Sequence, residues 1–176
     1  MDFITRDITI GCLSHADPKD YYEIYTHPSM LLSITHETVP SSIAHAQAEL
    51  KRHSQLQWTG EGIYWGIYKD GILIGMCGLY SWQLEDKTIE LSYEVHPDHC
   101  GKGIATAATR YALRFAQNTF RVDRVICHTL FDNLASQRVA EKAGFRLIAT
   151  IERDVYFNGS WRTRKKYEWR PPRTTT

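Results

Sequence analysis

The sequence lacks the features that would place a protein in a membrane or outside the cell. No apolar run approaches the length of about 20 residues that a transmembrane helix needs. The first residues, MDFITRDITIG, have neither the basic start nor the apolar stretch of a secretory signal. The four cysteines form no C-x-x-C pair and do not suggest an extracellular disulfide framework: Cys12, Cys77, Cys100 and Cys127. We therefore expect a reduced, cytoplasmic protein.

The chain also lacks an excess of either charge. Its formal net charge is +1, so no overall field attracts it to DNA or to an anionic membrane. Hydrophobic residues are plentiful at 43%, which excludes a disordered chain, and 176 residues suit one hydrophobic core. We expect one domain over residues 1–170 and a flexible tail over 171–176.

Apolar periodicity and turn signals predict alternating strands and helices. Strands are expected at 7–13, 63–68, 72–82, 88–95, 122–131 and on both sides of Asn158-Gly159. Helices are expected at about 18–25, 42–57, 103–120 and from Asn133 to Gly144. Asp70-Gly71 and Asn158-Gly159 supply the positive φ angles of tight hairpins. The order β-α-α-β-β-β-α-β-α-β-β predicts an α/β (α+β) fold with helices packed on a mixed sheet.

Residues 93–108, YEVHPDHCGKGIATAA, predict a turn that binds phosphate between a strand and a helix. Gly101 and Gly103 allow the backbone to approach a ligand, and the helix N-terminus favours an anion. Lys102 could add an ion pair. A P-loop is excluded because Gly103 follows the lysine, and the dinucleotide fingerprint is excluded because Thr106 stands where its third small residue belongs. By itself, G-x-G fits a plain tight turn equally well.

Two other clusters are best interpreted as ordinary surface residues that bind no ligand. His96, His99 and Cys100 lie around a proline with no second ligand cluster, so solvated turn residues are expected and no metal. Residues 161–173 carry one acidic and six basic residues, which indicates a solvated edge strand and no nucleic-acid partner.

Three segments of the chain, 88–116, 124–147 and 154–169, together resemble the GNAT-type N-acetyltransferases. The resemblance is closest to the Rim group, which acetylates the N-termini of ribosomal proteins. It implies a mostly antiparallel twisted sheet of about seven strands, flanked by about four helices. It also implies that the sheet splays between its fourth and fifth strands, here 88–95 and 122–131.

The resemblance implies acetyl-CoA as the acyl donor. The family pattern [QR]-x-x-G-x-[GA] maps to 100–105, where Cys100 departs from Gln or Arg and both small residues are kept. Asn133 and Ser136 match the family's N-x-x-S; their alternative interpretation is a helix cap and a polar residue in the first turn. The donor-binding residues implied are Val95, Cys100, Gly101, Lys102, Gly103, Ile104, Ala105, Thr106, Asn133 and Ser136.

The catalytic residues cannot all be copied from the family. Its tyrosine acid, one or two turns beyond the asparagine, is replaced here by Val139, Ala140 and Glu141. Ser136 is the predicted proton donor to the departing thiolate. The candidate bases are Glu90 and Glu94, which share one face of a strand, and His128 on the next strand. For each of the three, a solvated, paired or core role is the alternative.

The implied reaction is direct attack by a primary amine on acetyl-CoA in a ternary complex. An α-amine, with a pKa of about 7.7–8.0, needs only a weak base. The acidic N-terminal 60 residues suit a cationic acceptor but do not separate a protein N-terminus from a small amine. Seven aromatic residues could line its groove, although core packing is the simpler reading: Tyr21, Tyr22, Tyr25, Trp58, Trp65, Tyr80 and Trp82. The alternatives are a non-catalytic acyl-CoA-binding module and, less favoured, an RNA-binding protein; the chain could be a monomer or a homodimer.

Overall fold

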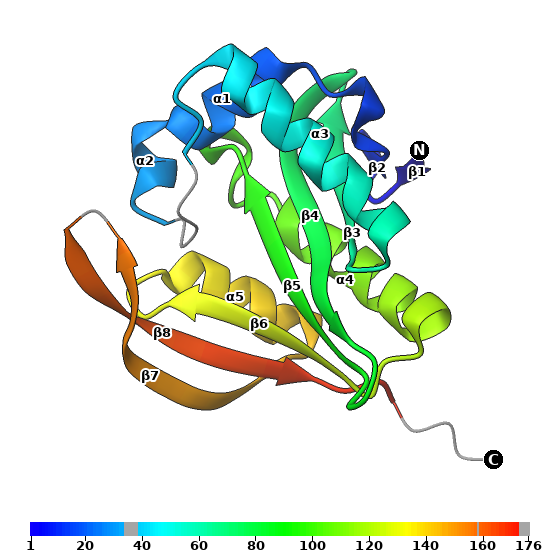
Figure 1. The fold of residues 1–176 in the computed structure, drawn as a ribbon, viewed down its shortest axis with the longest axis vertical. Helices are drawn as coiled ribbons and strands as arrows, with labels where there is room; N and C mark the ends of the chain where they lie inside the picture. Colours follow the sequence, from blue (N-terminus) through cyan, green and yellow to red (C-terminus); the bar gives the residue numbers. More distant parts are fainter. Residues whose placement is uncertain (34–38, 158, 173–176) are drawn as a thin grey trace.

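The computed structural model describes residues 1–33, 39–157 and 159–172, and its strands form one eight-stranded sheet in the order β1-β2-β3-β4-β5-β6-β8-β7 (Figure 1). The strands are β1 (Asp2–Phe3), β2 (Ile8–Gly11), β3 (Ile63–Lys69), β4 (Ile72–Gln83), β5 (Thr88–Val95), β6 (Arg124–Leu130), β7 (Arg146–Phe157) and β8 (Ser160–Trp169). All neighbours pair antiparallel except β5 and β6, which are parallel. The mixed, mostly antiparallel sheet is confirmed. The eighth strand is the two-residue β1, which is too short to show an alternating pattern.

The helices are α1 (Pro18–Thr26), α2 (Pro28–Leu31), α3 (Ile43–Thr59), α4 (Ile104–Phe115) and α5 (Leu134–Ala143). Four were predicted, while the one-turn α2 is too short for a periodic signal. The predicted helix over 103–120 is interrupted, because its last residues, Ala116–Phe120, form a π-helical turn. Side chains cap the N-termini of two helices: the Asp17 side chain accepts from Lys19 N before α1, and Ser42 Oγ accepts from His45 N at 3.1 Å before α3.

Two hydrophobic clusters pack on opposite faces of the sheet. On one face, α1, α2 and α3 cover a cluster that includes Ile24, Leu50 and Met76. On the other, α4 and α5 cover a cluster that includes Leu91 and Leu113. In Figure 1, α3 accordingly passes in front of β3 and β4, and α4 lies behind them. The sheet therefore separates two helical layers.

Glycine-containing turns join the hairpins, as predicted. Asp70 and Gly71 adopt φ angles of 51° and 81° between β3 and β4. Gly159 has φ 76° between β7 and β8, while Asn158 lies outside the described residues. Of the tail predicted to be flexible, residues 173–176 also lie outside them.

The sheet opens between β5 and β6, where the resemblance implied a splay. The two strands pair only over Thr88–Leu91 with 124–127. Beyond that point β5 stays on β4 as far as Val95, while β6 stays on β8 as far as Leu130. Among the described residues, the last half of β5 therefore has no strand partner on the β6 side, and a wedge-shaped gap begins after Leu91.

Further features of the described part of the chain bear on the expectations from composition. None of its helices is both long and apolar enough to cross a membrane. All four cysteines are free thiols. Within residues 1–33, 39–157 and 159–172, no three His, Cys, Asp or Glu side chains gather as a metal site would require.

Candidate active site

The turn that precedes α4 forms an anion-binding cradle. Gly101 and Gly103 have φ angles of 77° and 79°, in the left-handed region that favours glycine. Gly103 is the N-cap of α4 and supplies no side-chain cap, so the first-turn amides, beginning at Ile104, keep their N–H groups for another acceptor. A Cβ built on either glycine would meet no protein atom within 4 Å. The residues therefore fit a diphosphate: converging amides, a helix N-terminus and room at the backbone.

A cavity of about 570 Å³ extends from this cradle along the gap between β5 and β6 to the start of α5. Of the ten predicted donor-binding residues, nine line it, the exception being Lys102. The Lys102 Nζ instead donates to the Asp98 carbonyl at 2.9 Å. Two cations that the sequence did not single out, Arg138 and Lys142, also line the cavity one helical turn apart on α5. We call this space the donor cavity.

Val95 presents its main chain to the donor cavity. The His96 amide donates to the Ile74 carbonyl of β4 at 2.8 Å. Because backbone groups alternate along an antiparallel strand, the amide of Val95 points away from β4 and into the gap. The Cys100 thiol lies 3.6 Å from the Val95 carbonyl, and burial raises the pKa of that thiol.

Asn133 and Ser136 stand at the far end of the donor cavity. The Asn133 Oδ1 accepts from Ser136 N at 3.0 Å, so the capping interaction considered from the sequence is present. The Ser136 Oγ lies 3.0 Å from the Tyr93 Oη, and the Tyr93 hydroxyl also donates to the Ser136 carbonyl at 2.8 Å. Burial raises the pKa of Tyr93 well above its usual value. The only sequence signal for Tyr93 was its alternation with Val95, which places both on the same face of β5.

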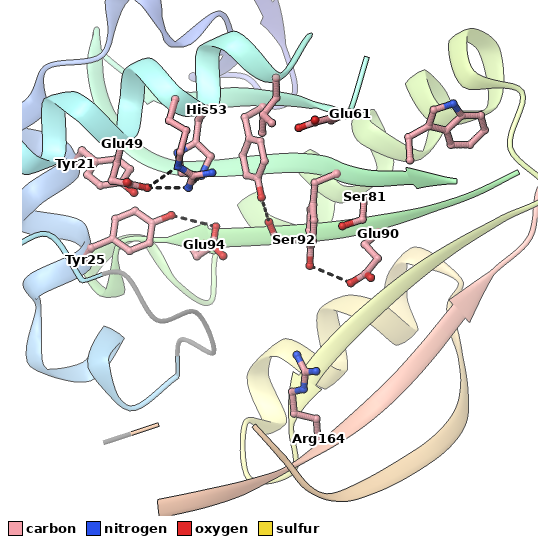
Figure 2. A pocket seen from close by; sticks show the side chains of 15 residues that line it. Tyr21, Tyr25, Glu49, His53, Glu61, Ser81, Glu90, Ser92, Glu94 and Arg164 are labelled. Carbon is pink, nitrogen blue, oxygen red and sulfur yellow. Dashed lines mark hydrogen bonds and ion pairs between the residues drawn. The ribbon is translucent and has the colours of Figure 1, made fainter. Parts of the chain in front are cut away.

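A second cavity, of about 600 Å³, lies on the opposite face of the sheet, under α1 and α3 (Figure 2). We call it the acceptor cavity. Its floor is the other face of β5, from which the alternate residues Glu90, Ser92 and Glu94 point into the cavity. The two glutamates thus lie on one face of the strand, as strand periodicity predicts. Each of these side chains contacts a tyrosine hydroxyl: Tyr80 with Glu90 at 3.2 Å, Tyr64 with Ser92 at 3.2 Å and Tyr25 with Glu94 at 3.3 Å.

The two cavities meet at the splay. Four residues line both of them: Tyr80, Ser92, Glu94 and Arg164. Arg164 projects from β8 on the far side of the gap (Figure 2) and is paired with Asp154. A molecule in one cavity can therefore reach a molecule in the other without crossing the paired part of the sheet.

Of the predicted bases, Glu94 is the one at this junction. Its residue is 8% exposed, and its carboxylate accepts from the Tyr25 hydroxyl. Burial first, and the charge of Glu94 second, raise the pKa of Tyr25 well above its usual value, so the phenol keeps its proton and remains a donor to Glu94.

Glu90 and His128 form a pair across β5 and β6. The Glu90 Oε2 lies 3.5 Å from the His128 Nδ1. The hydrogen bond from His128 lowers the pKa of Glu90, against the opposing effect of burial. Glu90 therefore stays ionised at neutral pH, and it lines the acceptor cavity whereas His128 lines the donor cavity.

We expect this pair to make stability pH-dependent on the acid side. Because folding lowers the pKa of Glu90, its contribution is complete above the ordinary glutamate pKa of about 4.3 and is lost as pH falls through the lowered value. Glu90→Gln should therefore reduce the free energy of unfolding in urea near neutral pH by less than about 1 kcal/mol, since one-third of the side chain is exposed. The deficit should begin to shrink as pH falls below about 4.3 and should vanish only below the lowered pKa of Glu90. An equal deficit at both pH values would contradict this account, and His128→Asn serves as the matched variant.

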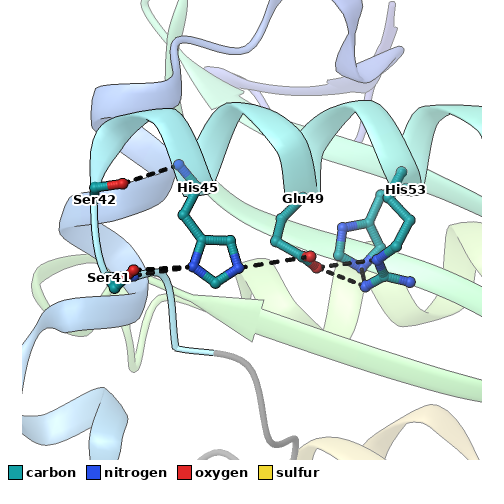
Figure 3. A network of polar contacts seen from close by, with 6 residues as sticks. Ser41, Ser42, His45, Glu49 and His53 are labelled. Atoms are coloured by element: carbon teal, nitrogen blue, oxygen red, sulfur yellow. Dashed lines mark hydrogen bonds and ion pairs between the residues drawn. The ribbon is translucent and has the colours of Figure 1, made fainter.

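The acceptor cavity is acidic and aromatic. Its wall carries four carboxylates, of Glu49, Glu61, Glu90 and Glu94, against the two guanidinium groups of Arg52 and Arg164. Arg52 is neutralised by Glu49 at 2.7 Å, within a polar network along α3 that continues through His45 to Ser41 (Figure 3). The remaining excess of negative charge favours a cationic guest.

The seven aromatic residues suggested as groove lining lie in three environments: the acceptor cavity, the core and the exposed surface. Tyr21, Tyr25, Tyr80 and Trp82 line the acceptor cavity, joined by Tyr64, which was not predicted. Trp65 is buried in the core beneath α4, and Tyr22 packs against the core under α1. Trp58 is 81% exposed and lines neither cavity.

Comparison with known proteins agrees with this architecture. The family model described as the acetyltransferase (GNAT) domain matches residues 8–146. The chain is 27% identical over 149 residues to the probable N-acetyltransferase YjcK of Bacillus subtilis (strain 168), covering 83% of this chain and 78% of that protein.

Solved structures share the fold over nearly the whole chain. The structure of the microcin C7 self-immunity acetyltransferase MccE in complex with acetyl-CoA and AMP superposes with a TM-score of 0.83 at 16% identity, covering 96% of this chain and 94% of that one. The structure of RimL, a ribosomal L7/L12 alpha-N-protein acetyltransferase in complex with coenzyme A, superposes with a TM-score of 0.85 at 15% identity, covering 96% of each chain.

The matching domain model defines the class of protein as an acetyltransferase, and the splayed sheet and the glycine cradle agree with that class. The chain belongs to the GNAT acetyltransferase family and is an N-acetyltransferase of that type. The resemblance in its sequence to GNAT enzymes is thereby confirmed.

Proposed function

We propose that this enzyme transfers an acetyl group from acetyl-CoA in the donor cavity to a primary amine in the acceptor cavity. The observation that carries the proposal is the junction of the two cavities at Ser92 and Glu94, which lets an amine from one face of the sheet meet a thioester on the other. The acidic wall of the acceptor cavity supports a substrate that arrives as an ammonium ion.

The donor would be held mainly by the main chain. The amides of the cradle, from Gly101 to Thr106, would bind the diphosphate, and the main chain of Val95, which lines the donor cavity, would bind the pantetheine arm. Arg138 and Lys142 would add positive charge from α5. Because amides do this work, Cys100 can replace the Gln or Arg of the family pattern.

The chemistry requires an uncharged nitrogen close to the thioester carbonyl. Glu94 accepts the proton of the acceptor ammonium, directly or through a water. The amine then attacks the carbonyl carbon, a C–N bond forms, and the Val95 amide donates to the developing oxyanion. The nitrogen of this tetrahedral intermediate gives its second proton to water. The C–S bond breaks with its electron pair going to sulfur, to which the Ser136 hydroxyl donates. Juxtaposition of the two reactants supplies much of the acceleration.

The test is a thiol-release assay on the purified protein with acetyl-CoA and a panel of acceptors. The panel contains short peptides with free α-amines, peptides with blocked α-amines, polyamines and aminoglycosides, with succinyl-CoA as an alternative donor. We expect calorimetry to detect acetyl-CoA binding and at least one primary amine to accelerate thiol release.

Three other outcomes separate the alternatives. Tight binding of acetyl-CoA without acyl transfer to any amine would favour a non-catalytic CoA-binding module. Absence of acetyl-CoA binding would overturn the assignment of the donor cavity. Affinity for RNA that falls steeply with salt would instead point to the basic β8 strand as the functional surface.

A further inference from the structure

The family's tyrosine acid is missing from α5, but the fold supplies a tyrosine hydroxyl to the same region from another element. Tyr93 comes from β5, on the face that lines the donor cavity, and its side chain spans the gap to α5. Its Oη lies 3.0 Å from the Ser136 Oγ and 2.8 Å from the Ser136 carbonyl oxygen. Two contacts to one residue fix the hydroxyl of Tyr93 against the first turn of α5.

The hydrogen positions follow from what each atom can do. The Ser136 carbonyl can only accept, so the single Tyr93 hydrogen is donated there, and a Tyr93 lone pair is left to accept from the Ser136 hydroxyl. The Ser136 carbonyl oxygen and the Ser136 Oγ both lie within hydrogen-bonding distance of the Tyr93 hydroxyl. When the Ser136 hydrogen turns toward another acceptor, the Tyr93 hydrogen can turn to the Ser136 Oγ without any movement of the ring.

We propose that Tyr93 is a positioning residue for acyl transfer, which holds the Ser136 hydroxyl toward the sulfur of the thioester and donates to its Oγ as the thiolate departs. This inference rests on the proposed function. The first amine proton goes to Glu94 and the second goes to water, the C–S electron pair goes to sulfur, and the thiolate leaves with a hydrogen bond from Ser136. A donor on Oγ strengthens that bond, because hydrogen bonds in a chain polarise one another.

Tyr93 does not give up its own proton in this scheme. An ordinary thiol has a pKa of about 8.5, whereas burial keeps the pKa of Tyr93 well above 10. Transfer from the phenol to the thiolate would therefore be uphill, while hydrogen-bond donation to a stable leaving thiolate is not. The role is thus distinct from that of a tyrosine general acid.

The experiment is a double-mutant cycle on the full chain with the best acceptor from the panel. Tyr93→Phe removes one oxygen and should lower kcat about tenfold, the equivalent of one hydrogen bond, with KM for acetyl-CoA changed less than about twofold. Ser136→Ala should lower kcat at least as much. In the Ser136→Ala background, Tyr93→Phe should have almost no further effect, because its action passes through the serine.

Tyr68→Phe is the matched control. Tyr68 is also a tyrosine whose hydroxyl donates to a main-chain carbonyl, that of Cys12 at 2.7 Å, but it lies in the core under α1. It should lose similar stability in urea and retain its kcat. An unchanged kcat in Tyr93→Phe, or a tenfold loss that persists without the serine hydroxyl, would overturn the inference. Both of these results are measured against a wild-type enzyme that transfers the acetyl group. If the proposed function were wrong, the wild type itself would show no transfer, so the two failures can be told apart.

Discussion

Gly103→Ala should weaken acetyl-CoA binding by about 10- to 100-fold, the loss of one or two charge-assisted hydrogen bonds. The new Cβ would enter a space where no protein atom lies within 4 Å, and which the proposed function assigns to the diphosphate. It would also disfavour the φ of 79° that aims the first amides of α4. Isothermal calorimetry with acetyl-CoA measures the effect directly, without depending on the acceptor.

Gly71→Ala separates ligand contact from backbone strain. Gly71 has nearly the same φ, 81°, and its Cβ would also meet nothing within 4 Å, but it lies in the hairpin between β3 and β4. Each alanine should destabilise the fold by about 1–2 kcal/mol in urea. Only Gly103→Ala should lose affinity for acetyl-CoA, and equal affinities in the two variants would contradict the cradle.

Glu94→Gln should lower kcat by about 10²- to 10³-fold, the range expected for a lost general base. Glutamine has the same shape and can still accept from the Tyr25 hydroxyl, so the junction of the cavities should keep its geometry. The affinity for acetyl-CoA should be unchanged, because the cradle lies beyond the end of β5. Steady-state kinetics with saturating acetyl-CoA gives the comparison.

Glu90→Gln is the matched variant for the base. It removes a carboxylate from the same face of β5, but one that lies in the acceptor cavity alone and is held by His128. We expect it to reduce kcat less than tenfold and mainly to raise KM for a cationic amine. If Glu94→Gln were as active as the wild type while His128→Asn lost activity, the base would be the histidine.

Most of the fold could be predicted from sequence because local signals agree with tertiary packing. The hairpin at Asp70-Gly71, the cap at Ser42 and the C-terminal Gly144 of α5 each depend on one or two residues whose backbone preference decides the conformation. The elements that were missed, β1 and α2, have two and four residues. They are held by neighbours rather than by a periodic pattern, so no window of sequence reveals them.

The residues of the candidate site likewise fall into those that local sequence predicts and those that it does not. Glu90 and Glu94 could be placed on one face because strand periodicity alone requires it, and the cradle could be placed because glycine spacing is local. Tyr93 and Arg138 could not be assigned, since their importance arises only when β5 and α5 meet across the gap. Nor could the sequence show that Lys102 turns back to the carbonyl of Asp98. What remained hidden was how side chains pair in space, both between β5 and α5 and within the turn before α4.

The short parallel pairing of β5 with β6 has a consequence for the order of events. The two cavities share only Tyr80, Ser92, Glu94 and Arg164 among their lining residues, so each offers a largely separate volume beside the splay. Under the proposed function, the two reactants can therefore be bound at the same time, as a sequential mechanism requires.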